Sequence, residues 1–518
     1  MQYSTNRYDD DYRTRRRISE RRRRRRRQVM IRRVVVACAG LLVLTLIVGG
    51  IALAIKNGLI GGNEPSQHTR GNSVANVTLE DPNNEQETIK ETEPAPRTPE
   101  QQIADLIEKA DRLSAMYDNP AAIELIQSYP GYADIPQLTE AIAKYEATQA
   151  TYVRYSSLRT IPHIFYHSLI PDNSKAFDGD GNSQGYNEVM TTIGEFMKIM
   201  EIMYNNGYVF ISLHDMGHIE VHEDGTEEMV PGDIWLPEGK KPVVVSQDDL
   251  SYYHYMTGDG FPNRIVLDEN GLPTCEMTAD DGTIYYGDYD MVPLMDRFVE
   301  EHPDASYRGA KGCIALTGYN GILGYRTDSV YKNYSECDPY QQAWLDAHPD
   351  FDWDKEREEA MKVVEGMKAD GWDFASHSYG HLNYSWPEKG TGGISFESLQ
   401  RDALLWEEEV EPLLGGDIDI IIFAFGEDIA SWHADDYDNS ERYHFLKSLG
   451  FDYYCNVDSN PYWVVYGDDY LRQGRRNLDG QRMWEAISSA TNPDRKDRLS
   501  DLFDANEVFD WSRPTPVY

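Results

Sequence analysis

The sequence predicts an α/β protein whose main part is a distorted (β/α) barrel of about seven strands. From Ile161 onward, short apolar segments alternate with amphipathic segments of helical spacing, which is the pattern of a parallel sheet or barrel. Two of the apolar segments end in Asp or His side chains, and barrels carry their chemistry at the carboxyl ends of their strands. Ahead of this part, the sequence predicts a transmembrane helix and a small helical module.

Residues 1–33 differ sharply in charge from the rest of the chain. They hold fourteen Arg against four acidic residues, whereas the remainder has 35 Lys and Arg against 84 Asp and Glu. Parts with such different charge are expected in different environments. An arginine-rich tail can bind nucleic acid, but one that directly precedes an apolar run favours a topology signal with affinity for anionic lipid. We therefore expect a basic cytoplasmic tail and no nucleic-acid partner.

Residues 34–55, VVVACAGLLVLTLIVGGIALAI, are 22 consecutive uncharged residues. As a helix they would extend about 33 Å, which is enough to span a bilayer. A cleaved signal peptide has a shorter apolar core and a small-residue cleavage site, which the following KNGLIGG does not resemble. Because the arginines precede the span, the positive-inside rule predicts a single-pass protein of the cell membrane with a cytoplasmic N-terminus and an extracellular catalytic part.

Two further segments separate the span from the barrel. Residues 56–98 are rich in Asn, Glu, Thr, Pro and Gly and predict a disordered acidic linker. Residues 99–155 predict a helical stalk, with Thr98 as N-cap and Pro99 at the first helical position. Its first apolar stripe follows helical spacing and consists of Ile103, Leu106, Ile107 and Leu113.

Residues 161–518 form the predicted catalytic domain. Its expected strands are HIFYH, YVFISL, KPVVVSQ, CIALTG, WDFASHS, IDIIIFAFG and FDYYCNV. A helix is expected to begin after Thr192, with Thr192 and Glu195 forming a capping box at its start. Long excursions at 263–290 and 316–353 interrupt the alternation, and the Asn-Gly step in the first predicts an inserted β-hairpin. Such excursions either shape a binding groove or decorate the surface.

The chemistry-bearing residues follow two of these strands. VVVSQDDLSYY places Asp248 and Asp249 side by side at a strand end, and FASHSYGH places His377 and His381 after another. Two imidazoles and one carboxylate make a facial ligand set for zinc or another divalent ion. Because successive strand residues point in different directions, one Asp can ligate a metal while its neighbour serves as a general base.

SQDD followed by HSYGH resembles the first two motifs of the polysaccharide deacetylases (NodB homology, carbohydrate esterase family 4), over roughly residues 161–484. The resemblance implies a NodB-like barrel in which Asp248 is the catalytic base. It also implies a divalent metal ion, with zinc as the first expectation, held by Asp249, His377 and His381.

The sequence departs from the family pattern in several places. The usual first motif reads T-F-D-D-G, so Gln247 and Leu250 are departures. In IFAFGED, Ala424 stands where the family often has Pro, and an Arg that some members have there is missing. Arg475 or Arg476 could orient Asp248 instead, although a solvated basic pair is the interpretation that we favour.

The family's late histidine is also missing, since no His follows His444. PHIFYHSLI at the start of the domain resembles the rearranged order of poly-N-acetylglucosamine deacetylases, in which an early YH segment supplies this residue. The first and last strands of a closed barrel are neighbours, so the change in chain order keeps the geometry. The resemblance therefore implies His167 as the catalytic general acid, with His163 as a weaker candidate.

The sequence predicts no catalytic role for the other aromatic and histidine residues. An aromatic set could stack on sugar rings or pack in the core: Tyr252, Tyr253, Tyr379, Trp386 and Phe425. LHDMGHIEVH could supply a second metal site from His214, His218 and His222, with His254 nearby in the chain. We interpret this segment as a polar loop.

Together these residues imply metal-dependent hydrolysis of N-acetyl groups from N-acetylglucosamine-containing polysaccharide, either peptidoglycan or exopolysaccharide, at the outer face of the cell membrane. The expected partners are an N-acetylated glycan and the membrane, reached through residues 34–55. The alternative is a catalytically weak or inactive relative that binds glycan and organises the cell wall. A glycan hydrolase fits poorly, because it needs carboxylates that flank the glycosidic bond.

Overall fold

The computed structural model describes residues 97–430, 435–458 and 462–518. The chain divides into two compact units, residues 1–101 and 102–518. The predicted basic tail, membrane span and linker up to residue 96 lie outside the described residues, so they stay predictions. Of the helices that are described, none has the length and apolar character needed to cross a bilayer.

The predicted helical stalk consists of three helices, α2 (Pro99–Ala115), α3 (Asn119–Gln127) and α4 (Pro136–Gln149). Thr98 and Pro99 occupy the expected positions, because the Thr98 hydroxyl accepts the Gln101 backbone N–H and the Gln101 side chain accepts the Thr98 N–H. The helices share a small core built around Ala110, Ala122, Ile126, Leu138 and Tyr145.

Seven parallel strands close a barrel, as the sequence predicts. They are β2 (His163–Tyr166), β7 (Lys241–Asp248), β11 (Cys313–Leu316), β12 (Asp373–Ser376), β13 (Ile420–Ile422), β14 (Tyr453–Val457) and β16 (Leu471–Asn477). They follow one another around the ring in the order β7, β11, β12, β13, β14, β16 and β2, and β2 pairs with β7 to close it. The carboxyl ends of all seven strands therefore meet at one rim.

One barrel strand differs from the prediction. YVFISL forms β3 (Tyr208–Phe210), which pairs with the start of β7 outside the ring. Its place is taken by β16, which pairs with both β14 and β2. The sequence of β16, LRQGRRN, did not indicate a buried strand because it is polar, yet six of its seven residues are buried. The short β15 (Val464–Tyr466) runs antiparallel beside it.

Helices surround the barrel. The longer ones are α7 (Ile193–Asn205), α9 (Met291–Glu301), α10 (Pro339–Ala347), α11 (Trp353–Ala369), α12 (Phe396–Glu409), α14 (Glu441–Leu449) and α15 (Gly480–Ser488). α7 begins with the predicted capping box of Thr192 and Glu195. The shorter ones are α5 (Asn173–Ala176), α6 (Ser183–Val189), α8 (Leu213–Met216), α13 (Asp435–Asp438) and α16 (Ala505–Val508).

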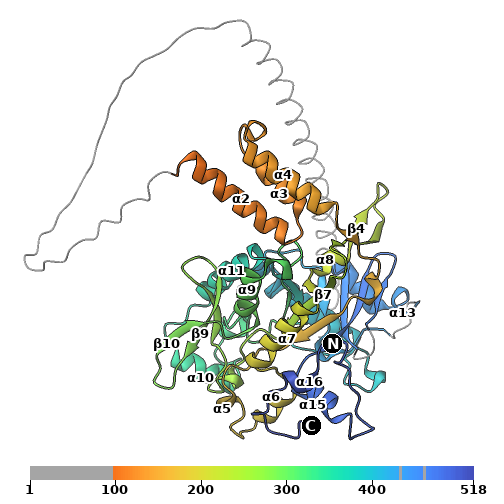
Figure 1. Ribbon diagram of the computed structural model, residues 1–518. Helices are drawn as coiled ribbons and strands as arrows, with labels where there is room; N and C mark the ends of the chain where they lie inside the picture. Colours follow the sequence, from red (N-terminus) through yellow and green to blue (C-terminus); the bar gives the residue numbers. More distant parts are fainter. Residues whose placement is uncertain (1–96, 431–434, 459–461) are drawn as a thin grey trace, which may run out of the picture. The chain divides into compact units, whose positions relative to one another are not determined.

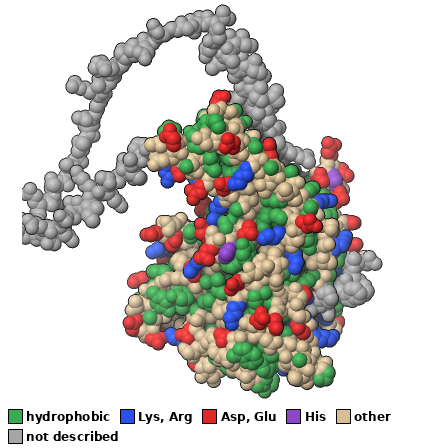
Figure 2. All heavy atoms as spheres, in the orientation of Figure 1, with side chains coloured by type: hydrophobic (Ala, Val, Ile, Leu, Met, Phe, Trp, Pro, Cys, Tyr) green, Lys and Arg blue, Asp and Glu red, His purple; other side chains and the backbone are tan. Residues whose placement is uncertain are grey.

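The excursion at 263–290 forms an antiparallel sheet of β8 (Arg264–Leu267), β9 (Pro273–Thr278) and β10 (Ile284–Gly287). The predicted hairpin is therefore present, with a third strand added. Figure 2 shows hydrophobic side chains gathered at the left, over the region of β9 and β10 in Figure 1. Exposed apolar residues there are Leu272, Ile284, Tyr285 and Tyr286.

The segment LHDMGHIEVH is not the polar loop that we expected. It forms α8 and then β4 (Gly217–Val221), which pairs antiparallel with β5 (Glu227–Pro231). The alternating tail of this segment, GHIEV, is the pattern of a half-buried strand, and its burial alternates accordingly. A further two-stranded pair joins β1 (Val153–Arg154) to β6 (Trp235–Leu236).

Candidate active site

Asp248 and Asp249 lie at the end of β7, and the backbone turns between them. Asp248 is the last strand residue and is buried, whereas Asp249 has a left-handed φ of 58°. The Asp249 N–H still donates to the carbonyl of Ala315 in β11, at 3.1 Å. A left-handed conformation is costly for a residue other than glycine and persists where the surrounding structure enforces it. Here it separates two adjacent carboxylates, so that each has its own partners.

Asp249 meets the two predicted histidines. Suitable ligand atoms of Asp249, His377 and His381 all lie within 4.8 Å of one another. Asp249 Oδ2 is 3.9 Å from His377 Nε2 and 3.4 Å from His381 Nε2. The predicted metal ligands are therefore brought together.

In His377 and in Asp249, a neighbouring group binds one of the two possible ligand atoms and leaves the other free to bind a metal. Nδ1–H of His377 donates to the carbonyl of Ile422 at 2.8 Å, which leaves Nε2 facing the cluster. The Tyr253 hydroxyl donates to Asp249 Oδ1 at 2.8 Å, which leaves Oδ2. Burial lowers the pKa of His377 against the opposing effect of the two aspartates, so its imidazole is neutral near pH 7. Two imidazoles and one carboxylate fit Zn²⁺ or a similar divalent ion.

The loop that carries the histidines is held by a carboxylate from α12. Ser378 and His381 have left-handed φ values of 62° and 50°. Asp402 accepts the backbone N–H groups of Tyr379 and Gly380 at 2.8 and 2.9 Å. It also accepts the hydroxyl of Tyr384 at 2.7 Å. These bonds satisfy loop donors that no strand partner reaches, and they hold the strained backbone in place.

Asp248 is oriented by Arg475 of β16. The guanidinium makes two hydrogen bonds to the carboxylate, at 2.7 and 2.9 Å, and a third to the hydroxyl of Ser246 at 3.1 Å. Both charged side chains are buried, and the guanidinium lies over the Phe165 ring. Burial acts to raise the pKa of Asp248, but Arg475, with further help from the histidines of the site, outweighs it and holds the pKa at about 2.

The solvated basic pair that we favoured from the sequence is therefore wrong for Arg475. Arg476, on the other face of β16, is also largely buried and makes hydrogen bonds to the Arg498 carbonyl and to Asp501. Alternate residues of a strand face opposite sides, which explains why only one member of the pair reaches the barrel interior. Inspection of LRQGRRN alone could not decide which member that is.

His167 follows β2 at the same rim. It is half-buried, and its Nδ1 is hydrogen bonded to the carbonyl of Val189 at 2.9 Å. Its electrostatic interaction with Asp248 helps to lower the pKa of that carboxyl. The other ring nitrogen is the one that remains to exchange a proton with a substrate.

His163 lies deeper in the barrel, away from the rim. It is fully buried, with Nδ1 3.1 Å from Gln473 Oε1 and Nε2 2.9 Å from the Ser246 hydroxyl. Burial, reinforced by Arg475, lowers its pKa well below the ordinary histidine value. His163 is thus a neutral support for Ser246, which in turn contacts Arg475, and it is not placed to reach a substrate.

Exposed aromatic rings flank the ligand cluster on two sides. Phe425 is 66% exposed, has φ 60°, and its ring centroid is 4.6 Å from that of His381. On the Asp249 side, Tyr255 and Tyr319 are exposed, and both stack on Tyr253. These two tyrosines were not singled out from the sequence, where nothing distinguishes them among 35 tyrosines.

The other predicted stacking residues are less accessible. Tyr252 and Tyr253 are buried and use their hydroxyls inside the protein. Tyr379 donates its hydroxyl to Asp328 at 2.8 Å, and Trp386 is half-buried. Of the five, Phe425 is the residue placed to contact a sugar ring directly.

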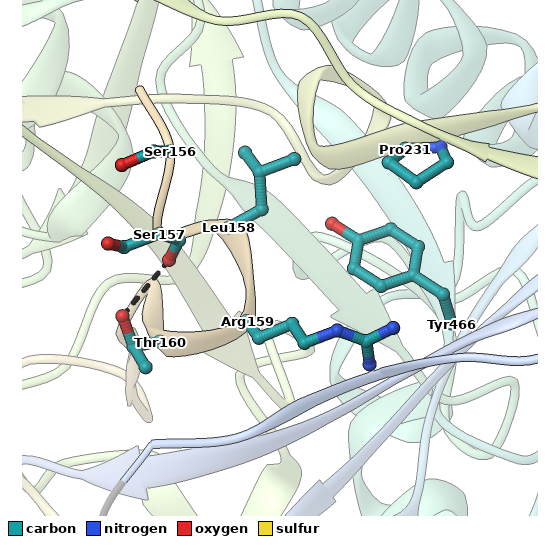
Figure 3. Close-up of a pocket in the computed structure, with 7 residues that line it drawn as sticks. All are labelled: Ser156, Ser157, Leu158, Arg159, Thr160, Pro231 and Tyr466. Atoms are coloured by element: carbon teal, nitrogen blue, oxygen red, sulfur yellow. Dashed lines mark hydrogen bonds between the residues drawn. The ribbon is translucent and has the colours of Figure 1, made fainter. Parts of the chain in front are cut away.

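The remaining histidines do not gather into a ligand group within the described part of the chain. His214 contacts Asp419, His222 contacts Glu228, and His254 contacts Tyr331. A separate cavity of about 310 Å³ lies beside the segment that precedes β2, at the opposite end of the strand from His167 (Figure 3). Arg159 there lies against the ring of Tyr466.

The fold and the cluster define a closed parallel (β/α) barrel with a candidate metal centre at its carboxyl rim. No family model and no curated protein matches the chain. It is similar to the solved structure of Streptococcus pyogenes deacetylase PplD in complex with acetate, at 11% identity and a TM-score of 0.32, over 64% of this chain and 95% of that one. It is also similar to the structure of IcaB from Ammonifex degensii, at 10% identity and a TM-score of 0.30, over 62% and 92%. The geometry of the site, not these likenesses, carries the proposal below.

Proposed function

We propose that the chain is a metal-dependent polysaccharide deacetylase, which hydrolyses N-acetyl groups of N-acetylglucosamine-containing polysaccharide. One observation carries this proposal: Asp249 converges with two histidines, while the adjacent Asp248 is turned to a buried Arg475. The two carboxylates are thereby assigned to different tasks. Amide hydrolysis at a metal centre needs both a ligand and a separate base.

Asp249, His377 and His381 would hold the divalent ion, and their donor atoms fit Zn²⁺. When bound, such an ion would polarise the acetamide carbonyl and lower the pKa of a coordinated water. Asp248 is ionised at neutral pH, since its pKa is about 2, and it accepts the proton of the attacking water. Arg475 keeps both carboxylate oxygens in position. His167 donates a proton to the departing nitrogen, so that acetate and a free amine are released.

The substrate and location that we propose follow from parts of the chain outside the site. The apolar run at residues 34–55, with the arginines before it, supports a membrane anchor with the barrel outside the cell. Peptidoglycan and a nascent exopolysaccharide are the acetylated polymers that such a barrel could reach. The exposed rings of Phe425, Tyr255 and Tyr319 support a sugar chain as ligand.

The test is acetate release by the detergent-solubilised full chain from chitin oligomers and from peptidoglycan, with its metal content measured. Asp248→Asn and His377→Ala should abolish release, and only His377→Ala should also lower the metal content. His218→Ala, in the β4–β5 hairpin, is the matched control. Absence of acetate with every divalent metal and both substrates would leave the glycan-binding alternative, and shortened chains without acetate would indicate a glycan hydrolase.

A further inference from the structure

Asp290 is a buried carboxylate that receives four hydrogen bonds at the point where the first insertion returns to the barrel. It is 0% exposed and is the N-cap of α9. Its Oδ1 accepts the backbone N–H of Met291 at 2.7 Å, the backbone N–H of Leu169 at 3.0 Å and the side-chain amide of Gln247 at 2.8 Å. Its Oδ2 accepts the hydroxyl of Tyr252 at 2.6 Å.

Three of these donors belong to segments that carry site residues. Leu169 lies two residues after His167, and Gln247 lies directly before Asp248. Tyr252 lies in the turn that follows the aspartate pair. The Gln247 amide also reaches the carbonyl of His167 at 3.4 Å. One carboxylate thus connects the strand that supplies the acid to the strand that supplies the base.

This arrangement exceeds what a helix cap requires. The Asp352 N-cap of α11 accepts only from Asp354 and Lys355, which belong to its own helix. Asp290 accepts one bond from α9 and three from other segments. A carboxylate accepts hydrogen bonds on both of its oxygens, and here Oδ1 takes three donors and Oδ2 takes one.

The departure at Gln247 has a physical role in this arrangement. A phenylalanine, which the usual first motif of the deacetylases has at this position, offers no donor to Asp290. The Oε1 of Gln247 has no hydrogen-bond partner among the described residues. The amide N–H groups are therefore the part of this side chain that the barrel uses.

We infer that Asp290 is a positioning residue, which sets the separation of His167 from Asp248 through Leu169 and Gln247. This inference rests on the proposed function, in which His167 is the acid and Asp248 the base. Asp290 itself does not touch the ligand cluster. Its effect is expected on the rate of the chemical step, because misplacement of a reacting group by about 1 Å can cost roughly a hundredfold.

The test uses two variants that each remove one donor and keep the side-chain shape, Gln247→Met and Tyr252→Phe. The matched control is Ser306→Ala, which removes a buried hydroxyl that donates to the Ala310 carbonyl at 2.6 Å, in the segment before β11. Acetate release by the full chain is compared for a chitin oligomer and for 4-nitrophenyl acetate, with metal content and melting temperature recorded. The ester needs no acid, because 4-nitrophenolate leaves without a proton.

We expect Gln247→Met to lower kcat for the amide about ten- to a hundredfold, with KM and metal content unchanged. Its ester hydrolysis should stay within about twofold of wild type, since Arg475 still holds Asp248 by two hydrogen bonds and the metal ligands are unchanged, so that the displaced group is His167. Tyr252→Phe removes the donor that holds Asp290 Oδ2, so the carboxylate that binds Leu169 and Gln247 is less firmly fixed and the same selective loss is expected. This variant carries the test if Gln247→Met does not fold. Ser306→Ala should lose neither activity.

The outcomes separate the two proposals. Wild-type protein that releases no acetate from any glycan overturns the proposed function, and the positioning role falls with it. Active wild-type protein whose two variants keep full amide activity overturns only the positioning role. A parallel loss of amide and ester hydrolysis would show that the effect is not specific to the step that needs the acid, and it would also overturn the positioning role.

Discussion

Replacing Arg475 by methionine should destabilise the barrel and disable the base, because it leaves the Asp248 carboxylate buried without its partner. Arg475 is 0% exposed and makes two hydrogen bonds to Asp248, at 2.7 and 2.9 Å. Methionine fills part of the same volume against Phe165 but offers neither charge nor donors. The perturbation therefore isolates the ion pair from the packing around it.

The loss of unfolding free energy in Arg475→Met can be bounded in two ways. Removing one partner of a buried ion pair typically costs about 3–5 kcal/mol, because the remaining charge is uncompensated. The pKa of Asp248 is about 2 in the folded chain, and an unfolded aspartate has a pKa of about 3.9, which corresponds to about 2–3 kcal/mol of stability at pH 7. We therefore expect a loss of about 3 kcal/mol, partly relieved when the variant carboxyl takes up a proton.

The direction in which the unfolding free energy changes with pH provides the test. A carboxyl whose folded pKa is depressed contributes stability above its unfolded pKa, and that stability is lost as the pH falls from about 4 through about 2. In Arg475→Met, burial is no longer opposed by the guanidinium, so the pKa of Asp248 rises. The difference in unfolding free energy between wild type and variant should be largest at neutral pH. It should begin to narrow as the pH falls through the raised pKa of Asp248 in the variant, and it should narrow further from about pH 4 to about pH 2 as the wild type loses its ion pair.

Urea unfolding from pH 3 to 8, paired with acetate release over the same range, measures both effects. Arg475→Met should lose activity at neutral pH, and any residual activity should show an acid limb at higher pH than wild type. Arg475→Lys keeps the charge but not the paired hydrogen bonds, so its stability and activity should lie between those of wild type and Arg475→Met. A variant within about 1 kcal/mol of wild type at pH 7, with an unmoved acid limb, would refute this account.

Three further predictions concern the ligand cluster and its rim. Chelation should abolish acetate release, and added Zn²⁺ should restore it; His381→Ala should lower the metal content, whereas His218→Ala should not, as measured by elemental analysis. Tyr253→Phe removes the hydrogen bond to Asp249 Oδ1 and should weaken metal affinity about 10–100-fold in a competition titration with a chelator; unchanged affinity would show that the hydroxyl does not orient the ligand. Phe425→Ala should raise KM for chitin oligomers about three- to tenfold without changing ester hydrolysis, and equal effects on both substrates would argue against sugar stacking.

Local patterns explain which parts of the site could be predicted from sequence. Asp248 and Asp249 follow an apolar strand within a few residues, as do His377 and His381. In a parallel barrel such residues must reach the same rim, so their convergence follows from the alternation of strands and helices. The same reasoning places His167, because the first strand adjoins the last in a closed ring.

Arg475 could not be assigned by this reasoning, because β16 does not look like a buried strand. Its polar side chains find partners across the barrel interior, where Gln473 meets His163 and Arg475 meets Asp248. A polar strand is stable in such a place only if each group finds a partner, and those partners lie more than 200 residues away in sequence. The tertiary pairing, not the strand's own sequence, makes it a barrel strand.

The backbone at the rim shows how this arrangement is kept in place. Asp249, Ser378 and His381 all adopt left-handed φ values, each at a cost of roughly 1–3 kcal/mol. Buried carboxylates from the surrounding helices hold the adjacent segments: Asp402 of α12 accepts donors of the histidine loop, and Asp290 before α9 accepts donors beside the acid and the base. Because a buried charge without donors is itself costly, these carboxylates and the strained loops stabilise each other. The geometry of the site therefore depends on residues that no motif of ligand or catalytic side chains would reveal.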